Sequence, residues 1–307
     1  MARAATLSRR ARVTHPVVPS TFLFCPGNRP DRYDKALRGG APGVIIDLED
    51  AVPAADKAAA RRDALAWLAA LPVAGPGAPA VALRVSSPQT PAGLEDLYAL
   101  AHAGALPALD LVAVPKAEDA SELRMVHTHA AAANPALRLM ALVESARGVR
   151  RAADIAHAGP WLAAMAFGAA DFSVETGADN AWDALAYVRG RLLFETAGSG
   201  VPMLDVPHIA IDDDAGLRVD CERARAMGFS GKLAIHPRQW PIIVQAFAPD
   251  PRRLAWAGEV AAAYERAGRR ACAVGATMVD EPVYQSALRI LRRAAAPNPS
   301  AVGDHHA

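Results

Sequence analysis

Eight short apolar runs, each followed by a longer segment, constrain the fold of this 307-residue chain more than any other feature. Several runs are apolar at consecutive positions and not at alternating ones, which is typical of parallel strands covered on both faces. The runs span residues 21–25, 44–48, 81–85, 111–114, 137–143, 162–167, 201–206 and 232–235.

Helix-like segments rich in Ala, Leu and Arg separate these runs, and two more follow the last one. They span residues 31–38, 54–71, 93–103, 117–133, 148–158, 181–196 and 215–227, then 251–267 and 282–294. Eight strands with seven intervening helices predict an α/β fold, a (β/α)8 TIM barrel with a C-terminal helical extension. The alternative is an open doubly wound sheet, which is expected to carry a Gly-rich phosphate-binding turn such as G-x-G-x-x-G after an early strand. The chain lacks this motif.

The predicted organisation has four parts. Residues 1–19 form a basic, disordered N-terminus, 20–250 the barrel, 251–294 a helical lid or oligomer contact, and 295–307 a disordered tail. The first segment is rich in Arg and lacks acidic residues, so a transit peptide is the alternative to a frayed basic start.

Composition excludes several classes of partner. A formal net charge of +1 argues against nucleic acid or a membrane surface, so any anionic ligand must be held by a local cluster. No apolar run reaches the roughly 18 residues that span a bilayer. Three widely spaced cysteines indicate a reducing compartment, hence a cytoplasmic protein, or a mitochondrial matrix protein in a eukaryote. We expect Cys25 to be a packed small hydrophobe and not a nucleophile.

Two carboxylates, Glu144 and Asp171, follow the fifth and sixth apolar runs. Their separation of 27 positions is about one strand-plus-helix unit, which places both at the same end of neighbouring parallel strands. Such a pair suits Mg²⁺, which one or two carboxylates hold together with water and substrate oxygens. No His lies near at zinc-like spacing, so Zn²⁺ is disfavoured. The alternative for Glu144 is a helix N-cap.

Other charged residues also fall at the expected barrel mouth. Arg84 lies inside a strand and needs an anionic partner, either a barrel carboxylate or the carboxylate of a substrate. The acids Asp47, Glu49 and Asp50 need nearby cations, for which Arg84 and Lys116 are candidates. We expect Asp47 in a structural ion-pair network and the other two acids around the metal.

The remaining polar groups near strand ends have less specific interpretations. Arg29, Arg32 and Lys35 form a basic face suited to a phosphate or pyrophosphate, although a solvated helix face explains them nearly as well. Asp205 lies within the seventh run and His208 follows it. Packing is the simplest explanation of His208 and of His236, and residues 212–214 form an acidic helix start.

Taken together, these segments resemble the HpcH/HpaI aldolase and citrate lyase family, in its citrate-lyase-beta-like branch of citryl-CoA, malyl-CoA and citramalyl-CoA lyases. The matching stretches run in family order from about residue 21 to residue 283. They are FLFCPGNRPDRYDKAL, GVIIDLEDAVPAADKAAAR, ALRVSS, VAVPKAED, ALVESARGV, AFGAADF, AMGFSGKLAIHPRQ and ATMVDEPV.

The resemblance implies roles for individual residues. Glu144 and Asp171 look like the metal ligands, with Glu144 also at the substrate, and Arg84 looks like the residue that binds the substrate carboxylate. Arg32 and Lys35 fall in the loop region that approaches coenzyme A. Asp280, in MVDEP, matches an acid that reaches a neighbouring subunit's site, where it is the candidate proton donor. The chain departs from many relatives at Ala210, where they carry Asp. The resemblance therefore does not specify the substrate that the acyl or CoA side of the pocket accepts.

The resemblance also implies the reaction. It is a Mg²⁺-dependent carbon–carbon cleavage of a 3-hydroxyacyl-CoA, such as malyl-CoA, citramalyl-CoA or citryl-CoA, into a 2-oxo acid and an acyl-CoA, in a homotrimer or hexamer. Coenzyme A enters as part of the substrate. The alternatives are thioester hydrolysis at the same site, a CoA-independent 2-oxo acid aldolase, and a citrate lyase beta subunit that works with an acyl-carrier protein.

Overall fold

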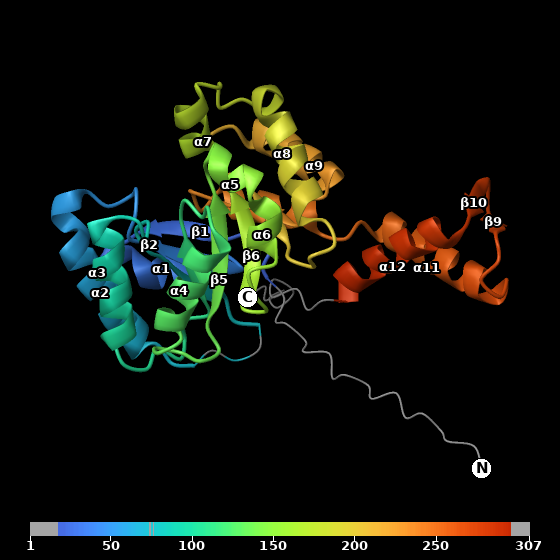
Figure 1. The fold of residues 1–307 in the computed structure, drawn as a ribbon. Coiled ribbons are helices and arrows are strands. Elements are labelled where there is room, and N and C mark those ends of the chain that lie inside the picture. Colours follow the sequence, from blue (N-terminus) through green and yellow to red (C-terminus); the bar gives the residue numbers. More distant parts are fainter. Residues whose placement is uncertain (1–17, 74, 76, 296–307) are drawn as a thin grey trace, which may run out of the picture.

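A single sheet of eight parallel strands, in the order β1 to β8, organises the computed structural model, which describes residues 18–73, 75 and 77–295 (Figure 1). Each strand pairs with the next along the chain. The strands are β1 Leu23–Pro26, β2 Gly43–Asp47, β3 Ala80–Arg84, β4 Leu111–Val114, β5 Arg138–Val143, β6 Leu162–Phe167, β7 Met203–Asp205 and β8 Gly231–Lys232.

The sheet closes on itself, because the segment after β8 pairs with β1. Leu23 and Ala234 form a parallel bridge. The Phe24 amide donates to the Ala234 carbonyl at 2.8 Å, and the Ala234 amide donates to the Phe22 carbonyl at 2.9 Å. This closure confirms the predicted (β/α)8 barrel and excludes the open doubly wound sheet.

Side chains on the strands alternate between two apolar layers, which explains why the runs are apolar at consecutive positions. Ile45 belongs to a cluster that fills the barrel, whereas Val44 and Ile46 belong to the larger cluster between strands and helices. The buried residues of the barrel cluster are Phe22, Ile45, Ala82, Leu111, Ala113, Met140, Leu142, Ala163, Ala164, Ala166, Leu204 and Leu233.

Helices cover the outside of the barrel (Figure 1). They are η1 Pro30–Arg32, α1 Tyr33–Arg38, η2 Ala54–Asp56, α2 Lys57–Ala70, α3 Pro91–His102, α4 Ala120–Ala130, α5 Ala146–Arg150, α6 Ala152–Ala156, α7 Ala169–Thr176, α8 Trp182–Thr196, α9 Asp214–Met227 and α10 Gln239–Phe247. The helix predicted over residues 148–158 is two short helices, α5 and α6. The sequence did not predict α7 or α10.

The C-terminal segment forms an arm with a core of its own. Helices α11 Pro251–Arg266 and α12 Glu281–Ala295 flank a hairpin of β9 Cys272–Val274 and β10 Thr277–Val279, which was not predicted. Figure 1 shows this arm projecting to one side of the barrel. Its buried residues are Ala257, Val260, Tyr264, Val279, Tyr284 and Ala287.

Two expectations from the sequence lie outside the described residues. The disordered character predicted for the N-terminus falls mostly on residues 1–17, and the predicted tail falls mostly on residues 296–307. Among the residues that the structure describes, no helix is both long enough and apolar enough to cross a membrane.

A buried ion triad joins the barrel to α8. Asp205 accepts from Arg189 Nε at 2.8 Å and from Lys232 Nζ at 2.7 Å, and all three side chains are almost fully buried. Leu204 faces the barrel interior, so Asp205 points outward, toward the helix layer. The expectation that Asp205 is one of the charged groups at the barrel mouth is therefore wrong.

We predict that Asp205→Asn lowers the free energy of unfolding by about 3 kcal/mol or more, because it leaves two buried cations without their anion. Chemical denaturation followed by circular dichroism measures the change. Asp212→Asn is the matched control, since Asp212 pairs with Arg238 at 2.7 Å but is 89% exposed, and its loss should cost less than about 1 kcal/mol. Equal stability of Asp205→Asn and the wild type would contradict this prediction.

Candidate active site

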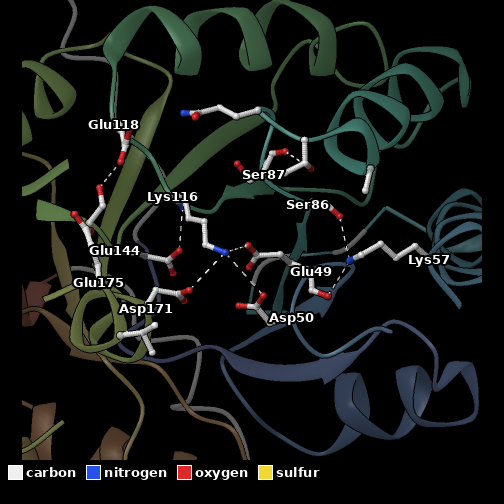
Figure 2. Close-up of a pocket in the computed structure, with 15 residues that line it drawn as sticks. Glu49, Asp50, Lys57, Ser86, Ser87, Lys116, Glu118, Glu144, Asp171 and Glu175 are labelled. Atoms are coloured by element: carbon white, nitrogen blue, oxygen red, sulfur yellow. Dashed lines mark hydrogen bonds and ion pairs between the residues drawn. The ribbon is translucent and has the colours of Figure 1, made fainter. Parts of the chain in front are cut away.

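An acidic cavity of about 690 Å³ opens at the carboxyl ends of strands β2 to β6 (Figure 2). Six carboxylates and two lysines line it, a balance that suits a cationic ligand. The lining residues are Glu49, Asp50, Lys57, Ser86, Ser87, Gln89, Thr90, Ala92, Lys116, Glu118, Glu144, Ser145, Asp171, Val174 and Glu175.

Glu144 is the deepest carboxylate of the predicted metal pair, at the end of β5, and is 4% exposed. Its Oε2 accepts from the backbone amide of Lys116 at 3.0 Å. Burial, together with the charge of Glu49, raises the pKa of Glu144 to about 8. Ser145 caps α5 by accepting from the Gly148 amide, so the alternative of Glu144 as a helix cap is wrong.

Gly168, at the end of β6, leaves room for the Glu144 side chain. A Cβ atom at this glycine would lie 2.3 Å from Glu144 Cγ and 2.4 Å from its Oε1. Only a residue without a side chain lets the two strand ends approach so closely while the carboxylate stays in the cavity.

Asp171 lies in the first turn of α7, the helix that the sequence did not predict. It faces the same cavity as Glu144, so the structure brings the predicted pair together. No group of three or more His, Cys, Asp or Glu side chains within residues 18–73, 75 and 77–295 is arranged to hold a metal ion. Two carboxylates in an open cavity nevertheless suit Mg²⁺, which retains waters and takes substrate oxygens.

Lys116 lies at the centre of the carboxylates (Figure 2). Its Nζ is 3.2 Å from Glu49 Oε1, 3.5 Å from Asp171 Oδ1 and 4.0 Å from Asp50 Oδ1. Burial opposes its charge, but these carboxylates more than offset that effect and raise the pKa of Lys116 above its ordinary value. Glu49 and Asp50, the acids after β2, therefore have the nearby cation that was predicted from the sequence.

Glu49 is buried, and burial raises its pKa to about 7 despite the nearby charges of Arg84 and Lys116. Both of its carboxylate oxygens lie at ion-pair distance from a cation, yet neither makes a directed hydrogen bond. A buried carboxylate in this condition has unused capacity for a cation or a proton.

Arg84 lies beneath the cavity and is bound by a barrel carboxylate. Its Nε and Nη2 donate to the two oxygens of Asp47, each at 2.7 Å, and its Nη1 is 2.8 Å from Glu49. The guanidinium also lies over the Phe24 ring, 4.9 Å from its centroid. Asp47 thus belongs to a structural network, as expected, and the binding of a substrate carboxylate by Arg84 stays a prediction.

Besides Arg84, which lies beneath the cavity, three predicted site residues do not line it. Arg32 and Lys35 are exposed around α1. Asp280 directly precedes α12 and accepts from the Val283 amide at 3.2 Å, and the junction of β10 with α12 lies at the far end of the arm in Figure 1. This chain therefore does not bring them to Glu144 and Asp171.

The other sequence expectations near the strand ends also have outcomes. His208 is held by Asp220, with Nδ1 at 2.7 Å, and His236 Nδ1 accepts from the Arg238 amide. Asp213 caps α9 through the Gly216 amide, which confirms the helix-start cluster. Cys25 is packed in the core, where burial raises its pKa to about 11.

Sequence reasoning missed several residues of the cavity wall. Lys57 donates to the Leu48 and Glu49 carbonyls at 2.7 and 3.0 Å. Glu175 accepts from the Ala146 amide at 3.0 Å. Glu118 follows Lys116 by two positions in the same strand-end motif, and that proximity was the available signal for it.

Comparisons with known proteins identify the family of this chain. The sequence model of the HpcH/HpaI aldolase/citrate lyase family matches residues 20–237. The chain belongs to this family. It is a family of enzymes, and the match covers all eight strands of the barrel and every lining residue of the cavity.

Two curated relatives within the family carry different activities in their names. A citrate lyase subunit beta-like protein of Mycobacterium tuberculosis is 37% identical, over 89% of this chain and 94% of its own. A (3S)-malyl-CoA thioesterase of Cereibacter sphaeroides is 35% identical, over 90% of this chain and 92% of its own.

One similar solved structure contains ligands. It is CitE of M. tuberculosis in complex with magnesium, acetoacetate and coenzyme A. That protein is 36% identical, with a TM-score of 0.72 over 90% of this chain and 98% of its own.

We predict that Gly168→Ala lowers the free energy of unfolding by about 1–3 kcal/mol, because the added methyl group displaces Glu144 or separates β5 from β6. Thermal and chemical denaturation measure the loss. Gly190→Ala is the control, since a Cβ there meets only Met227 Cε at 3.8 Å and alanine favours the interior of α8. Equal stability of the two variants would show that Glu144 yields without cost.

Proposed function

We propose that this chain is a Mg²⁺-dependent lyase that cleaves a carbon–carbon bond of a 3-hydroxyacyl-CoA, giving a 2-oxo acid and an acyl-CoA. The observation that carries the proposal is the meeting of Glu144 and Asp171 in one acidic cavity at the barrel mouth. The magnesium, acetoacetate and coenzyme A bound by the CitE relative support it.

Glu144 and Asp171 would hold the metal in this proposal. Glu144 and Asp171 face the cavity from neighbouring strand ends, and a bound cation would stabilise the ionised form of Glu144, whose pKa burial raises, so the donor set fits a hard divalent cation. When bound, Mg²⁺ supplies Lewis acidity that stabilises negative charge on the oxygens of the oxo-acid product.

Arg84 would bind the substrate carboxylate next to the metal. Asp47 fixes two of its nitrogens, so the guanidinium keeps one orientation, and Nη1 lies toward Glu49 in the cavity wall. A guanidinium held in this way meets an incoming carboxylate without reorganisation.

Glu49 is the carboxylate best suited to accept the proton of the 3-hydroxyl group, since its pKa of about 7 matches a general base near neutral pH. Loss of that proton lets the hydroxyl carbon become the oxo carbon, while the electron pair of the broken bond passes to the acyl-CoA enolate. The enolate carbon then takes a proton, so that this electron pair becomes a C–H bond and the neutral acyl-CoA is formed.

Asp280 would donate this proton from a neighbouring subunit, within a homotrimer or hexamer. The arm packs on its own core, and the cavity wall of this chain contains no residue of the arm among those described. Arg32 and Lys35, both exposed, would contact the phosphates of coenzyme A from the first loop region.

Thioester hydrolysis is the second candidate, because a relative of similar identity is named a (3S)-malyl-CoA thioesterase. The two reactions differ in product, since hydrolysis releases free coenzyme A and the lyase releases an acyl-CoA. An aldolase that acts without coenzyme A would not turn over thioesters. A citrate lyase beta subunit would need its acyl-carrier protein, so the isolated chain would be inactive.

We predict that Glu144→Ala and Asp171→Ala each lower turnover of malyl-CoA and citramalyl-CoA at least about a hundredfold at low Mg²⁺, because each removes a carboxylate from the metal. Turnover is measured across Mg²⁺ concentrations, with chromatography of the thioester products. Glu175→Gln, on the same cavity wall, should lose less than about tenfold. Near-normal turnover in both alanine variants would sink the metal assignment.

Asp280→Asn should lower kcat about a hundredfold or more while the melting temperature and the affinity for Mg²⁺ stay unchanged, because asparagine still caps α12 but donates no proton. Steady-state kinetics, thermal denaturation and Mg²⁺ titration give the three readouts. Wild-type kcat in this variant would exclude Asp280 as the proton donor.

A further inference from the structure

Lys116 contacts four carboxylates through two different groups. Its ammonium lies within 4.0 Å of Glu49, Asp50 and Asp171, and its backbone amide donates to Glu144. Figure 2 shows the side chain crossing the cavity between the strand ends. One residue therefore connects both predicted metal ligands to the acids after β2.

The backbone at Lys116 is held in an uncommon conformation. Its φ of +51° lies in the left-handed region, which among the described non-glycine residues only Arg269 shares. That region is sterically unfavourable for a residue with a side chain, and it recurs where structure constrains a functional site. Here the conformation directs the amide to Glu144 and leaves the ammonium among the other acids.

Ion pairs of 3.2 to 4.0 Å hold the ammonium in place. Glu49, its nearest partner, has no hydrogen bond to either carboxylate oxygen, and the Lys116 side chain is 39% exposed. Arg84 differs, since it makes two bonds of 2.7 Å to Asp47 and is 11% exposed. The lysine ammonium is thus free to move toward the opening, whereas the guanidinium is fixed.

We infer that the Lys116 ammonium is an exchangeable counter-ion, which neutralises the cavity acids without metal and moves aside when a divalent cation binds Asp171 and Glu144. The inference rests on the proposed function for the identity of the metal ligands. An ammonium 3.5 Å from Asp171 would repel a divalent cation bound there. The amide of Lys116 stays on Glu144 throughout, so the exchange leaves this ligand in position.

Mg²⁺ affinity in the absence of substrate tests the exchange. By calorimetry, Lys116→Met should bind Mg²⁺ about tenfold more tightly than the wild type, since the metal no longer displaces a cation. Lys57→Met is the matched control, because it removes the other lysine of the cavity, whose ammonium is bound by the Leu48 and Glu49 carbonyls. The control should change the affinity less than about threefold.

A second measurement needs no variant. Mass spectrometry of the wild type should show that an acylating reagent modifies the Lys116 amine faster as Mg²⁺ is added, at the concentrations that saturate calorimetric binding. The Lys57 amine should show no such dependence. Labelling of Lys116 that Mg²⁺ leaves unchanged or slows would overturn the inference.

The outcomes separate this inference from the proposed function. The exchange is overturned if Lys116→Met binds Mg²⁺ no more tightly than the wild type, or if Lys57→Met gains as much affinity. The metal site still stands in that case if the wild type binds Mg²⁺ and Glu144→Ala abolishes this binding. Absence of Mg²⁺ binding in the wild type and in Lys116→Met overturns both. Mg²⁺ binding by Lys116→Met but not by the wild type supports the exchange, because the ammonium then outcompetes Mg²⁺ for the carboxylates.

Discussion

Carboxylates at the mouth of this barrel can stay ionised together only while cations lie among them. Arg84 and Lys116 meet that need in two ways, one by fixed bidentate bonding and one by charge alone. Burial raises the pKa values of Glu144 and Glu49 even with these two cations present, so a further cation would stabilise the charged forms of both carboxylates. Such a group of carboxylates favours a small, hard cation, and the rest of the proposed chemistry depends on that cation.

The barrel supplies the geometry that this electrostatic demand requires. Parallel strands end at one face, so residues far apart in the sequence reach a common cavity. Gly168 lets β6 pass close to Glu144, and α7 then returns Asp171 to the same space. The outward Asp205 triad fastens β7 and β8 to α8 on the other side of the sheet, where it takes no part in the cavity.

Most of the fold follows from the sequence, because buried parallel strands leave a plain apolar signature. The short helix α7 was missed since it directly follows a strand, and α10 since Pro241 interrupts an apolar segment. Glu144 and Asp171 were found from their place after strands. The partner of Arg84 was not decided, because it depends on a distance between neighbouring strands. The direction of Asp205 was available from strand parity, whereas the left-handed backbone of Lys116 had no local signal.

The seam of the barrel lies between β8 and β1, next to its shortest strands, which have two and three residues. The cavity instead belongs to the ends of β2 to β6. Local opening of a sheet starts where the fewest backbone hydrogen bonds hold it. Amide exchange in this protein should therefore be faster in the short pairings of β7 with its neighbours than between β5 and β6, so that the barrel can open there while the strands that carry the carboxylates stay closed.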